Sequence, residues 1–373
     1  MLAALPLPAG PAQHETLASY LNRLAALHGL PVRELWDQLS IARPGSTRRV
    51  AVAERLAVVT DRPPEHLFGA LPELRDPAPD WTLWRHQSQP GCPRCDARHE
   101  GGPVLRLLPH HHYVCTKHHY WIGPPDAGQP ATPLDERLSD IVTAQRQHQR
   151  VVTRLGGAAM FDAVLTGFLI CGHLWANPQR PNADACRRWT RRTDLLIPPG
   201  AELRTFTASR LFAAVYPEAV SLAAIIASPL WRQRASGDAA GRREFLAEAA
   251  RRLGGAADEH DPGNQASIHW MLYDSHHPPS RPKKTLPDTR DHGAMRRPRP
   301  SPLSQQRTDR SADWFKLNRR GGNVILYHRH LTPVITREWA PPMDDIAATI
   351  AASGSTIGCR PPRMAKHGTL GVA

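Results

Sequence analysis

The chain has 373 residues, enough for two or three domains of roughly 100–200 residues, and 41% of them are hydrophobic, so a sizeable core is expected. The formal net charge of +13 favours a polyanionic partner, and nucleic acid fits better than an acidic membrane, because the longest apolar run, around 220–226, is far shorter than the ~20 residues that a bilayer requires. The N-terminus also lacks the basic and apolar regions of a secretory signal, so we expect no membrane association and a cytoplasmic, nucleoid-associated protein.

The first predicted helix lies at residues 16–28. Apolar residues from Leu17 to Ala25 follow the i, i+3, i+4, i+7, i+8 spacing of one helical face. Gly29 ends this helix, because glycine adopts the left-handed conformation past a helix end at little cost. A second helix is expected over 32–39, and the pair is a helix-turn-helix candidate.

A third helix is predicted over 48–59, with Ser46 as its N-cap, and a short fourth over 65–71. Residues 1–75 therefore form an expected helix-turn-helix-like N-terminal domain. A helix-turn-helix places one helix in the major groove of DNA. The alternative is that the helical pair serves only packing or protein docking.

Residues 76–130 differ in character from what precedes them. Pro, Gly, His and Cys become frequent, helical periodicity stops, and 104–108 is typical of a strand. Two pairs, Cys92-Pro-Arg-Cys95 and Cys115-Thr-Lys-His118, each separate two metal-binding side chains by two residues. This spacing predicts one structural Zn²⁺ ion bound by Cys92, Cys95, Cys115 and His118 in a zinc ribbon, because four protein ligands complete a tetrahedron and leave no open position for a reacting water.

Other ligand sets remain open at this point. His110, His111, His112 and His119 lie in the same module, and each competes with His118, which is favoured by spacing alone. A redox Cys-x-x-Cys would require a βαβ context that this segment lacks. Cys171, with His173 and Cys186, is an alternative second site, although a free cysteine on an apolar helix usually behaves as a small core residue.

Helical patterns return in residues 131–276, which we expect to form a helical domain. Residues 160–175 are apolar on nearly all sides and should lie centrally, and helical patterns continue over 208–231 and 242–253. Residues 277–312 are basic and rich in Pro, so they form an expected linker. A C-terminal mixed segment and tail, 313–373, follows. The predicted fold class is mainly α with a small β-containing zinc-ribbon module.

Basic side chains that could contact DNA fall into three groups. They lie on or after the second helix, in the linker, and at a turn near the start of the C-terminal segment. The candidates are Arg33, Arg43, Arg48, Arg49, Lys283, Lys284, Arg296, Arg297, Arg299, Arg319 and Arg320. A homodimer would match a two-fold DNA site, as it does in many helix-turn-helix proteins.

The order of these motifs resembles the TniQ family, the target-selection proteins of heteromeric transposons. The family's short Pro-rich opening is matched by Leu5-Pro-Leu-Pro8, and its Glu-(Ser/Thr)-Leu-x-Ser-Tyr-Leu-x-Arg-Leu-Ala helix by the segment from Glu15 to Ala25. The Cys-Pro-x-Cys and Cys-x-x-His pairs agree in order and spacing. Many relatives carry a second Cys-Pro-x-Cys-like pair, and this chain has none there. The resemblance covers about the first third of the chain and implies a DNA-binding adaptor that recruits an AAA+ ATPase or a transposase.

Two other functions compete with the adaptor. A zinc-containing helix-turn-helix transcriptional regulator has the same features, and only neighbouring genes would separate the two. A metal-dependent nuclease is the enzymatic alternative. The chain lacks the His-x-Glu of zinc deaminases before Cys92, and it has no phosphate loop and no nucleophile elbow, so we expect no catalytic residues.

Overall fold

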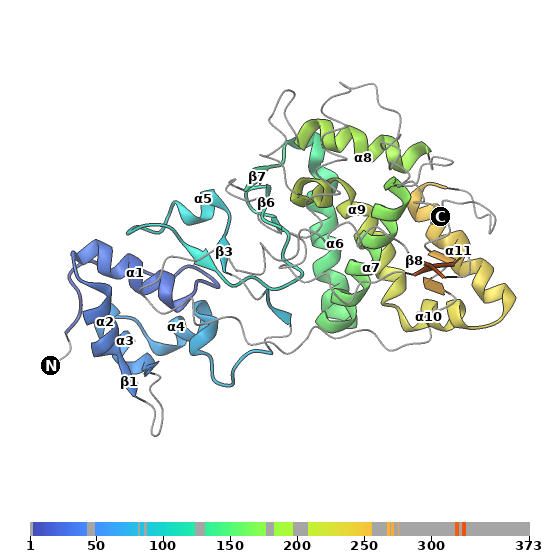
Figure 1. Cartoon of the computed structure of the whole chain (residues 1–373). Coiled ribbons are helices and arrows are strands. Elements are labelled where there is room, and N and C mark those ends of the chain that lie inside the picture. The colour runs from blue at the N-terminus through green and yellow to red at the C-terminus, as the bar shows by residue number, and fades with distance from the viewer. Residues whose placement is uncertain are drawn as a thin grey trace, which may run out of the picture.

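The computed structural model describes residues 3–42, 49–80, 83–85, 88–123, 131–176, 183–196, 208–255, 267–268, 270–271, 275, 318–320 and 323–325. These residues are mostly helical with a few small sheets, in line with the predicted fold class. The expected linker and its basic residues lie outside them, as do Arg43 and Arg48. Figure 1 shows the N-terminal helices at one end, small strands in the middle and longer helices at the other end.

The N-terminal elements are α1 (Leu17–His28), α2 (Val32–Leu39), β1 (Ser40–Ala42), β2 (Arg49–Ala51), α3 (Ala53–Thr60), α4 (Pro64–Ala70) and η1 (Pro72–Leu74). The middle elements are β3 (Gln89–Pro90), α5 (Pro93–Asp96), β4 (Leu105–Arg106), β5 (Val114–Cys115), β6 (Tyr120–Trp121) and β7 (Thr132–Pro133). The remaining ones are η3 (Glu136–Leu138), α6 (Ser139–Leu155), α7 (Gly157–Ala176), α8 (Ala183–Leu196), α9 (Ala208–Ile226), α10 (Pro229–Ser236), α11 (Ala239–Leu253), β8 (Asn318–Arg320) and β9 (Asn323–Ile325).

Helix α1 begins and ends as its sequence predicts. The Thr16 side chain accepts a hydrogen bond from the Ser19 amide at 3.1 Å, and Gly29 adopts the left-handed conformation with φ of 62°. The apolar stripe of α1 is buried with Leu35 and Leu39 of α2 and with residues of α3 and α4. Local capping and periodicity therefore account for this part of the fold.

The predicted helix 48–59 is wrong in its first turn. Residues Arg49–Ala51 form strand β2, which pairs antiparallel with β1, and α3 begins only at Ala53. The Arg49 guanidinium donates to the Ser40 hydroxyl at 2.8 Å and to the Ser40 carbonyl at 2.8 Å, so this segment is held against β1. Pairing with the preceding strand overrides the local helical pattern, and the expected cap, Ser46, lies outside the described residues.

Two further boundaries differ from the predictions. The strand expected over 104–108 is limited to Leu105–Arg106, which pairs with β3. The helical pattern over 208–231 is interrupted between Ile226 and Pro229, because proline lacks the amide that would continue the helix, and the axis bends by 76° there. In the described part of the chain no single helix is long and apolar enough to cross a membrane. The two helices of the bent pair reach that length and apolar composition only when they are counted together.

Three polar side chains of α1 and its N-terminal flank are buried at i, i+4 and i+8. Glu15, Ser19 and Arg23 have exposed fractions of 0%, 5% and 1%. Arg23 donates through Nε to Glu15 Oε1 and through Nη2 to Glu15 Oε2, both at 2.8 Å, and the Ser19 hydroxyl donates to Glu15 Oε1 at 2.9 Å. The ion pair is therefore bidentate and enclosed.

This polar face fastens the N-terminal helices to the segment around β4. The Leu105 amide donates to the Ser19 hydroxyl at 2.9 Å, and the Thr16 amide donates to the Leu105 carbonyl at 2.9 Å. Arg23 Nη1 donates to the Glu100 carbonyl at 2.6 Å. This polar face of α1 thus packs against the segment around Glu100 and Leu105 and is not exposed to solvent.

The largest core lies among α6 to α11 and includes side chains of the middle segment. Tyr113, Val114 and Trp121 pack in this core. The buried Gln145 of α6 accepts hydrogen bonds from the Tyr113 and Val114 amides at 2.9 and 3.0 Å and donates to the His111 carbonyl at 2.8 Å. The segment that leads into β5 and Cys115 is consequently tied to α6.

Acid should destabilise the fold through His148, which is 1% exposed. Burial lowers the pKa of His148 from 6.5 to about 3. Between these two pH values the unfolded chain binds more protons than the folded chain, so the free energy of unfolding decreases as pH falls below 6.5. We expect His148→Leu to reduce the pH dependence of the unfolding free energy by about 1.4 kcal/mol per pH unit between pH 6 and 4. Urea denaturation at several pH values measures this slope, and His66→Gln, at an exposed position, should leave it unchanged.

Candidate metal centre

Two short turns bring the predicted metal ligands together. Cys92 is the N-cap of α5, Pro93 occupies its first position, and the Cys95 amide donates to the Cys92 carbonyl at 2.9 Å. Cys115 ends β5, and the turn to β6 closes with the His119 amide donating to the Cys115 carbonyl at 2.8 Å. His119 has φ of 55°, and this left-handed residue completes the turn that places His118 beside the sulfurs.

The four donor atoms lie within 4.8 Å of one another. His118 Nδ1 is 3.2 Å from Cys95 Sγ, 3.5 Å from Cys92 Sγ and 3.8 Å from Cys115 Sγ, and the Cys95 and Cys115 sulfurs are 3.8 Å apart. A tetrahedral ion with Zn–S near 2.3 Å and Zn–N near 2.05 Å requires about 3.8 Å between two sulfurs and about 3.6 Å between sulfur and nitrogen. The cluster could therefore hold a metal ion at its centre.

The pKa values of the four side chains couple metal binding to the loss of protons. Burial, followed by the Cys115 thiol nearby, raises the pKa of Cys92 to about 12 and also raises that of Cys95. Desolvation and the cations of Lys117, Arg98 and Arg94 lower the pKa of His118, so its imidazole is neutral, as a ligand must be. A bound cation would stabilise the thiolates, and binding would release protons.

The other histidines of the module lie elsewhere. His110 contacts the Phe161 ring with centroids 4.3 Å apart, and the His111 ring is 6.2 Å from that of His148. The His112 carbonyl accepts a hydrogen bond from Arg85 at 2.7 Å, and His119 is exposed. Among the described residues, the cluster that includes His118 is the only group of three or more His, Cys, Asp or Glu that could hold an ion.

The two cysteines of the alternative second site lie in the protein interior. Cys171 and Cys186 are both fully buried in the largest core, where burial raises the pKa of Cys171 well above its ordinary value. The side chain of His173 lies outside the described set. Both cysteines occupy positions typical of small core residues.

The turn from Cys92 to Cys95 is linked to the segment before α1 through Asp96. Its Oδ2 accepts a hydrogen bond from the Gly91 amide at 3.1 Å, and its Oδ1 accepts one from Arg106 Nε at 3.0 Å. Arg106 is buried and also donates to the Gln13 carbonyl. Asp96, at the end of this turn, therefore positions Arg106, which in turn binds the backbone just before α1.

The predicted DNA-binding residues are dispersed. Arg33 is exposed on α2 with Asp37 3.9 Å away, whereas Arg49 is engaged in the β1–β2 hairpin. Arg319 and Arg320 lie in β8, which pairs with β9. The other candidates lie outside the residues that the structure describes.

Two groups of exposed cations were not among the sequence candidates. The cations of Arg94, Arg98 and Lys117 lie near the candidate metal ligands. Their places in the sequence, between or just after the ligands, could have identified this first group. Arg146, Arg150 and Arg154 occupy the exposed face of α6 at a spacing of four residues. The i, i+4, i+8 pattern of arginines could have identified this second group.

Residues 6–121 match the model of the TniQ family, so the resemblance predicted from the motifs is confirmed over this segment. The match extends from the residues before α1 to β6 and includes all four ligands of the candidate metal centre. It supports a transposition-associated adaptor role in general. No curated protein and no solved structure matches the chain.

Proposed function

We propose that this chain, whose residues 6–121 match the TniQ family, is a non-catalytic, nucleoid-associated adaptor that selects target DNA and recruits transposition machinery. The observation that carries the proposal is that the match spans the N-terminal helices and the candidate metal site, and that hydrogen bonds of Ser19, Arg23 and Arg106 join these two parts. A rigid joint of this kind suits a protein that holds two partners in a fixed orientation.

The ion in this proposal is zinc. Three thiolates and one imidazole are a common ligand set for structural zinc, and the donor distances fit its tetrahedral geometry. Cys92, Cys95, Cys115 and His118 would hold it, and the bound ion would supply structural stability. Four protein ligands leave no position for a reacting water, which supports a non-catalytic role.

The row of arginines on α6 supports a DNA-binding role. Arg146, Arg150 and Arg154 are exposed opposite the buried face that contains Gln145 and His148, and they form no ion pair with any described residue. They span about 12 Å along the helix. Unpaired guanidinium groups in a row suit contacts with successive phosphates.

A salt titration tests this role. We expect full-length protein to bind duplex DNA with an affinity that falls steeply as salt rises, and replacing all three α6 arginines with Ala to lower the slope of log K against log salt by about 2–3, since each phosphate contact contributes about 0.9. Fluorescence anisotropy measures both quantities. The matched Arg→Lys triple variant keeps the charge and should retain most of the slope. Absence of binding at ~50 mM salt would remove DNA from the proposal.

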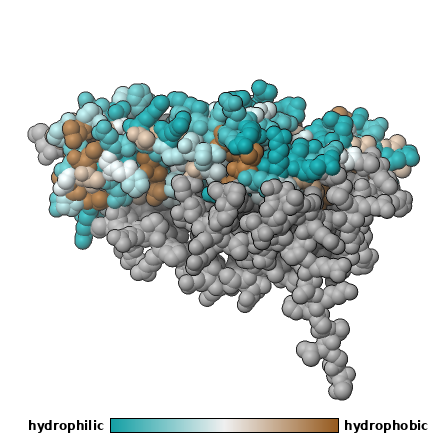
Figure 2. Space-filling view, turned by 90° about the horizontal axis from the view of Figure 1, so that it is seen from above, coloured by the Kyte–Doolittle hydropathy of each residue, from teal (hydrophilic) through white to brown (hydrophobic). Residues whose placement is uncertain are grey.

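Exposed apolar side chains at the N-terminal end support recruitment of a protein partner. Figure 2 shows apolar side chains on the surface at this end of the molecule. Within the described residues, the exposed large apolar side chains other than Leu230 belong to the N-terminal part: Leu7, Leu30, Ile41, Val50 and Val58. Ile41 and Val50 face each other across the β1–β2 hairpin. Such surfaces are typical of protein interfaces.

The proposed partner is an AAA+ ATPase or a transposase subunit, and a second copy of the chain is the alternative. Affinity purification from the native host followed by mass spectrometry is expected to recover the first class. Ile41→Ser with Val50→Thr should reduce the recovered partner without reducing the zinc content. Recovery of RNA polymerase subunits in its place would favour a transcriptional regulator.

A further inference from the structure

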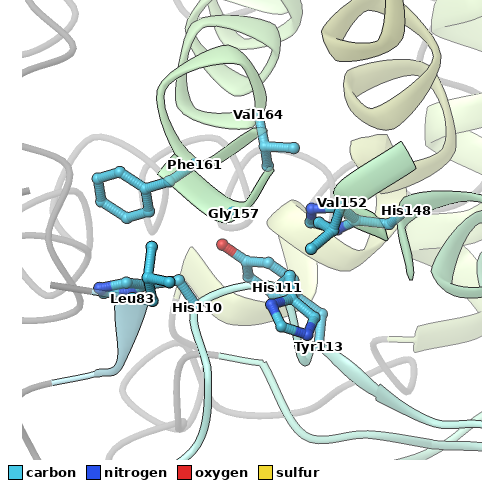
Figure 3. A pocket seen from close by; sticks show the side chains of 9 residues that line it. All are labelled: Leu83, His110, His111, Tyr113, His148, Val152, Gly157, Phe161 and Val164. Carbon is cyan, nitrogen blue, oxygen red and sulfur yellow. The ribbon is translucent and has the colours of Figure 1, made fainter. Parts of the chain in front are cut away.

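A cavity of about 110 Å³ lies between the segment that follows β4 and helices α6 and α7. Its lining comes from parts of the chain that are distant in sequence: Leu83, His110, His111, Tyr113, His148, Val152, Gly157, Phe161 and Val164. Figure 3 shows the Tyr113 phenol, the His148 ring and the side chains of Phe161 and Val164 converging on this space. Most of the lining is apolar.

His148, which lines this cavity, has a buried ring nitrogen that forms no hydrogen bond with the described residues. The exposed fraction of His148 is 1%, and its Nε2 has no hydrogen-bond partner among the described residues, while its Nδ1 lies 2.9 Å from the Tyr216 hydroxyl. Leaving a buried polar atom unpaired is unfavourable, and such atoms in native proteins usually meet a partner. The atom therefore marks a place where a ligand could form a hydrogen bond.

The surrounding hydrogen bonds fix which proton His148 carries. Gln145 Oε1 accepts from two backbone amides, and the Tyr216 hydroxyl lies 3.1 Å from it. Because a carbonyl oxygen only accepts, the Tyr216 proton points to Gln145, and the Tyr216 oxygen then accepts the proton on His148 Nδ1. His148 Nε2 is left as an acceptor, so its partner must be a donor.

We propose that this cavity binds a small planar organic molecule that carries one N–H or O–H donor, which it gives to His148 Nε2. A cavity of roughly 150 Å³ lined by apolar side chains holds benzene, so the smaller space here suits a five-membered ring or a molecule of similar size. A metal ion fits less well, because no three ligating atoms of the described residues come together in this cavity. The ligand would contact both α6–α7 and the segment before β5.

Pyrrole and furan form a matched pair of probes. Both are five-membered rings, and only pyrrole has an N–H donor. Saturation-transfer NMR with the full-length, zinc-loaded protein is expected to give saturable binding of both, with pyrrole about tenfold tighter because furan leaves Nε2 unpaired. Equal affinities, or no saturable binding of either ring, would overturn the proposal, and this comparison requires no variant.

Two variants locate the site. His148→Leu should lower the affinity for pyrrole about tenfold, to that of furan, and should change the affinity for furan less than twofold. The Tyr216 hydroxyl keeps its bond to Gln145 in this variant, so no buried donor loses its partner. Val164→Phe places a ring in the cavity and should abolish binding of both probes, with zinc content and helical circular dichroism as checks of folding. Unchanged pyrrole binding in the folded Val164→Phe protein would place the site elsewhere and refute the proposal.

Discussion

Cys92→Ser is expected to abolish metal binding and to unfold the turns around residues 92–95 and 115–118, which the small core at the ligands supports. The thiolate set is incomplete in this variant, and the free energy of binding of a structural zinc ion, roughly 10–16 kcal/mol in small zinc modules, is largely folding free energy. Within the described residues, the small core around the ligands contains only Cys92, Leu108, Cys115 and Ile122 as buried members. So small a core supplies little stability without the ion.

Atomic absorption and limited proteolysis measure the two consequences. Zinc should fall from one ion per chain to none, and cleavage should appear between β3 and β6. His118→Ala and His119→Ala form the matched pair, because the residues are adjacent and only His118 Nδ1 faces the sulfurs. His118→Ala should lose the ion and His119→Ala should keep it. Full zinc content in Cys92→Ser and His118→Ala would refute the ligand set.

Arg23→Met is expected to destabilise the N-terminal part by about 3–5 kcal/mol, because it leaves the Glu15 carboxylate buried without its partner. Glu15 is 0% exposed, so water cannot replace the guanidinium. The variant also removes the bonds of Arg23 to the Glu100 and Gly10 carbonyls, which belong to other segments. The N-terminal helices should then separate more easily from the metal-binding segment.

Chemical denaturation and hydrogen exchange of α1 measure this effect. Arg33→Met is the matched control, since Arg33 is 75% exposed and its exposed ion pair contributes little. Adding Glu15→Gln to Arg23→Met removes the unpaired charge and should restore part of the lost stability. Zinc content should remain at one ion per chain. A loss in Arg23→Met no larger than that in Arg33→Met would show that the buried pair does not hold the two parts together.

The local sequence predicts the elements whose causes lie within a few residues. The apolar spacing of α1, its cap at Thr16 and the left-handed Gly29 are all short-range effects, and they fix the helix bounds. The two-residue spacing of Cys92 and Cys95 likewise requires a tight turn. The motif from Glu15 to Ala25 predicts a resemblance to the TniQ family, which the match over residues 6–121 confirms for that segment.

Local periodicity is misleading where a segment outside the predicted helix pairs with its residues. The apolar pattern at 48–59 predicts one helix, but Arg49–Ala51 pairs with Ser40–Ala42, and inter-strand hydrogen bonds replace the first helical turn. The helical pattern over 208–231 is interrupted for a local reason. Pro229 lacks the amide that would continue the helix, and this residue is visible in the sequence. Only the first of these two differences required the tertiary structure.

The sequence by itself determined helix α1, the three cysteines of the candidate metal site and the match of the first third to the TniQ family. The tertiary structure decided which histidine lies beside the sulfurs. His110 and His111 pack against rings of α7 and α6, and the His112 carbonyl accepts a hydrogen bond from Arg85. These contacts with other segments cannot be read from the spacing of the histidines. The tertiary structure also decided the role of Glu15, Ser19 and Arg23. A polar helix face is solvated unless another segment covers it, and here the strand at Leu105 covers it, a contact between residues more than 80 positions apart.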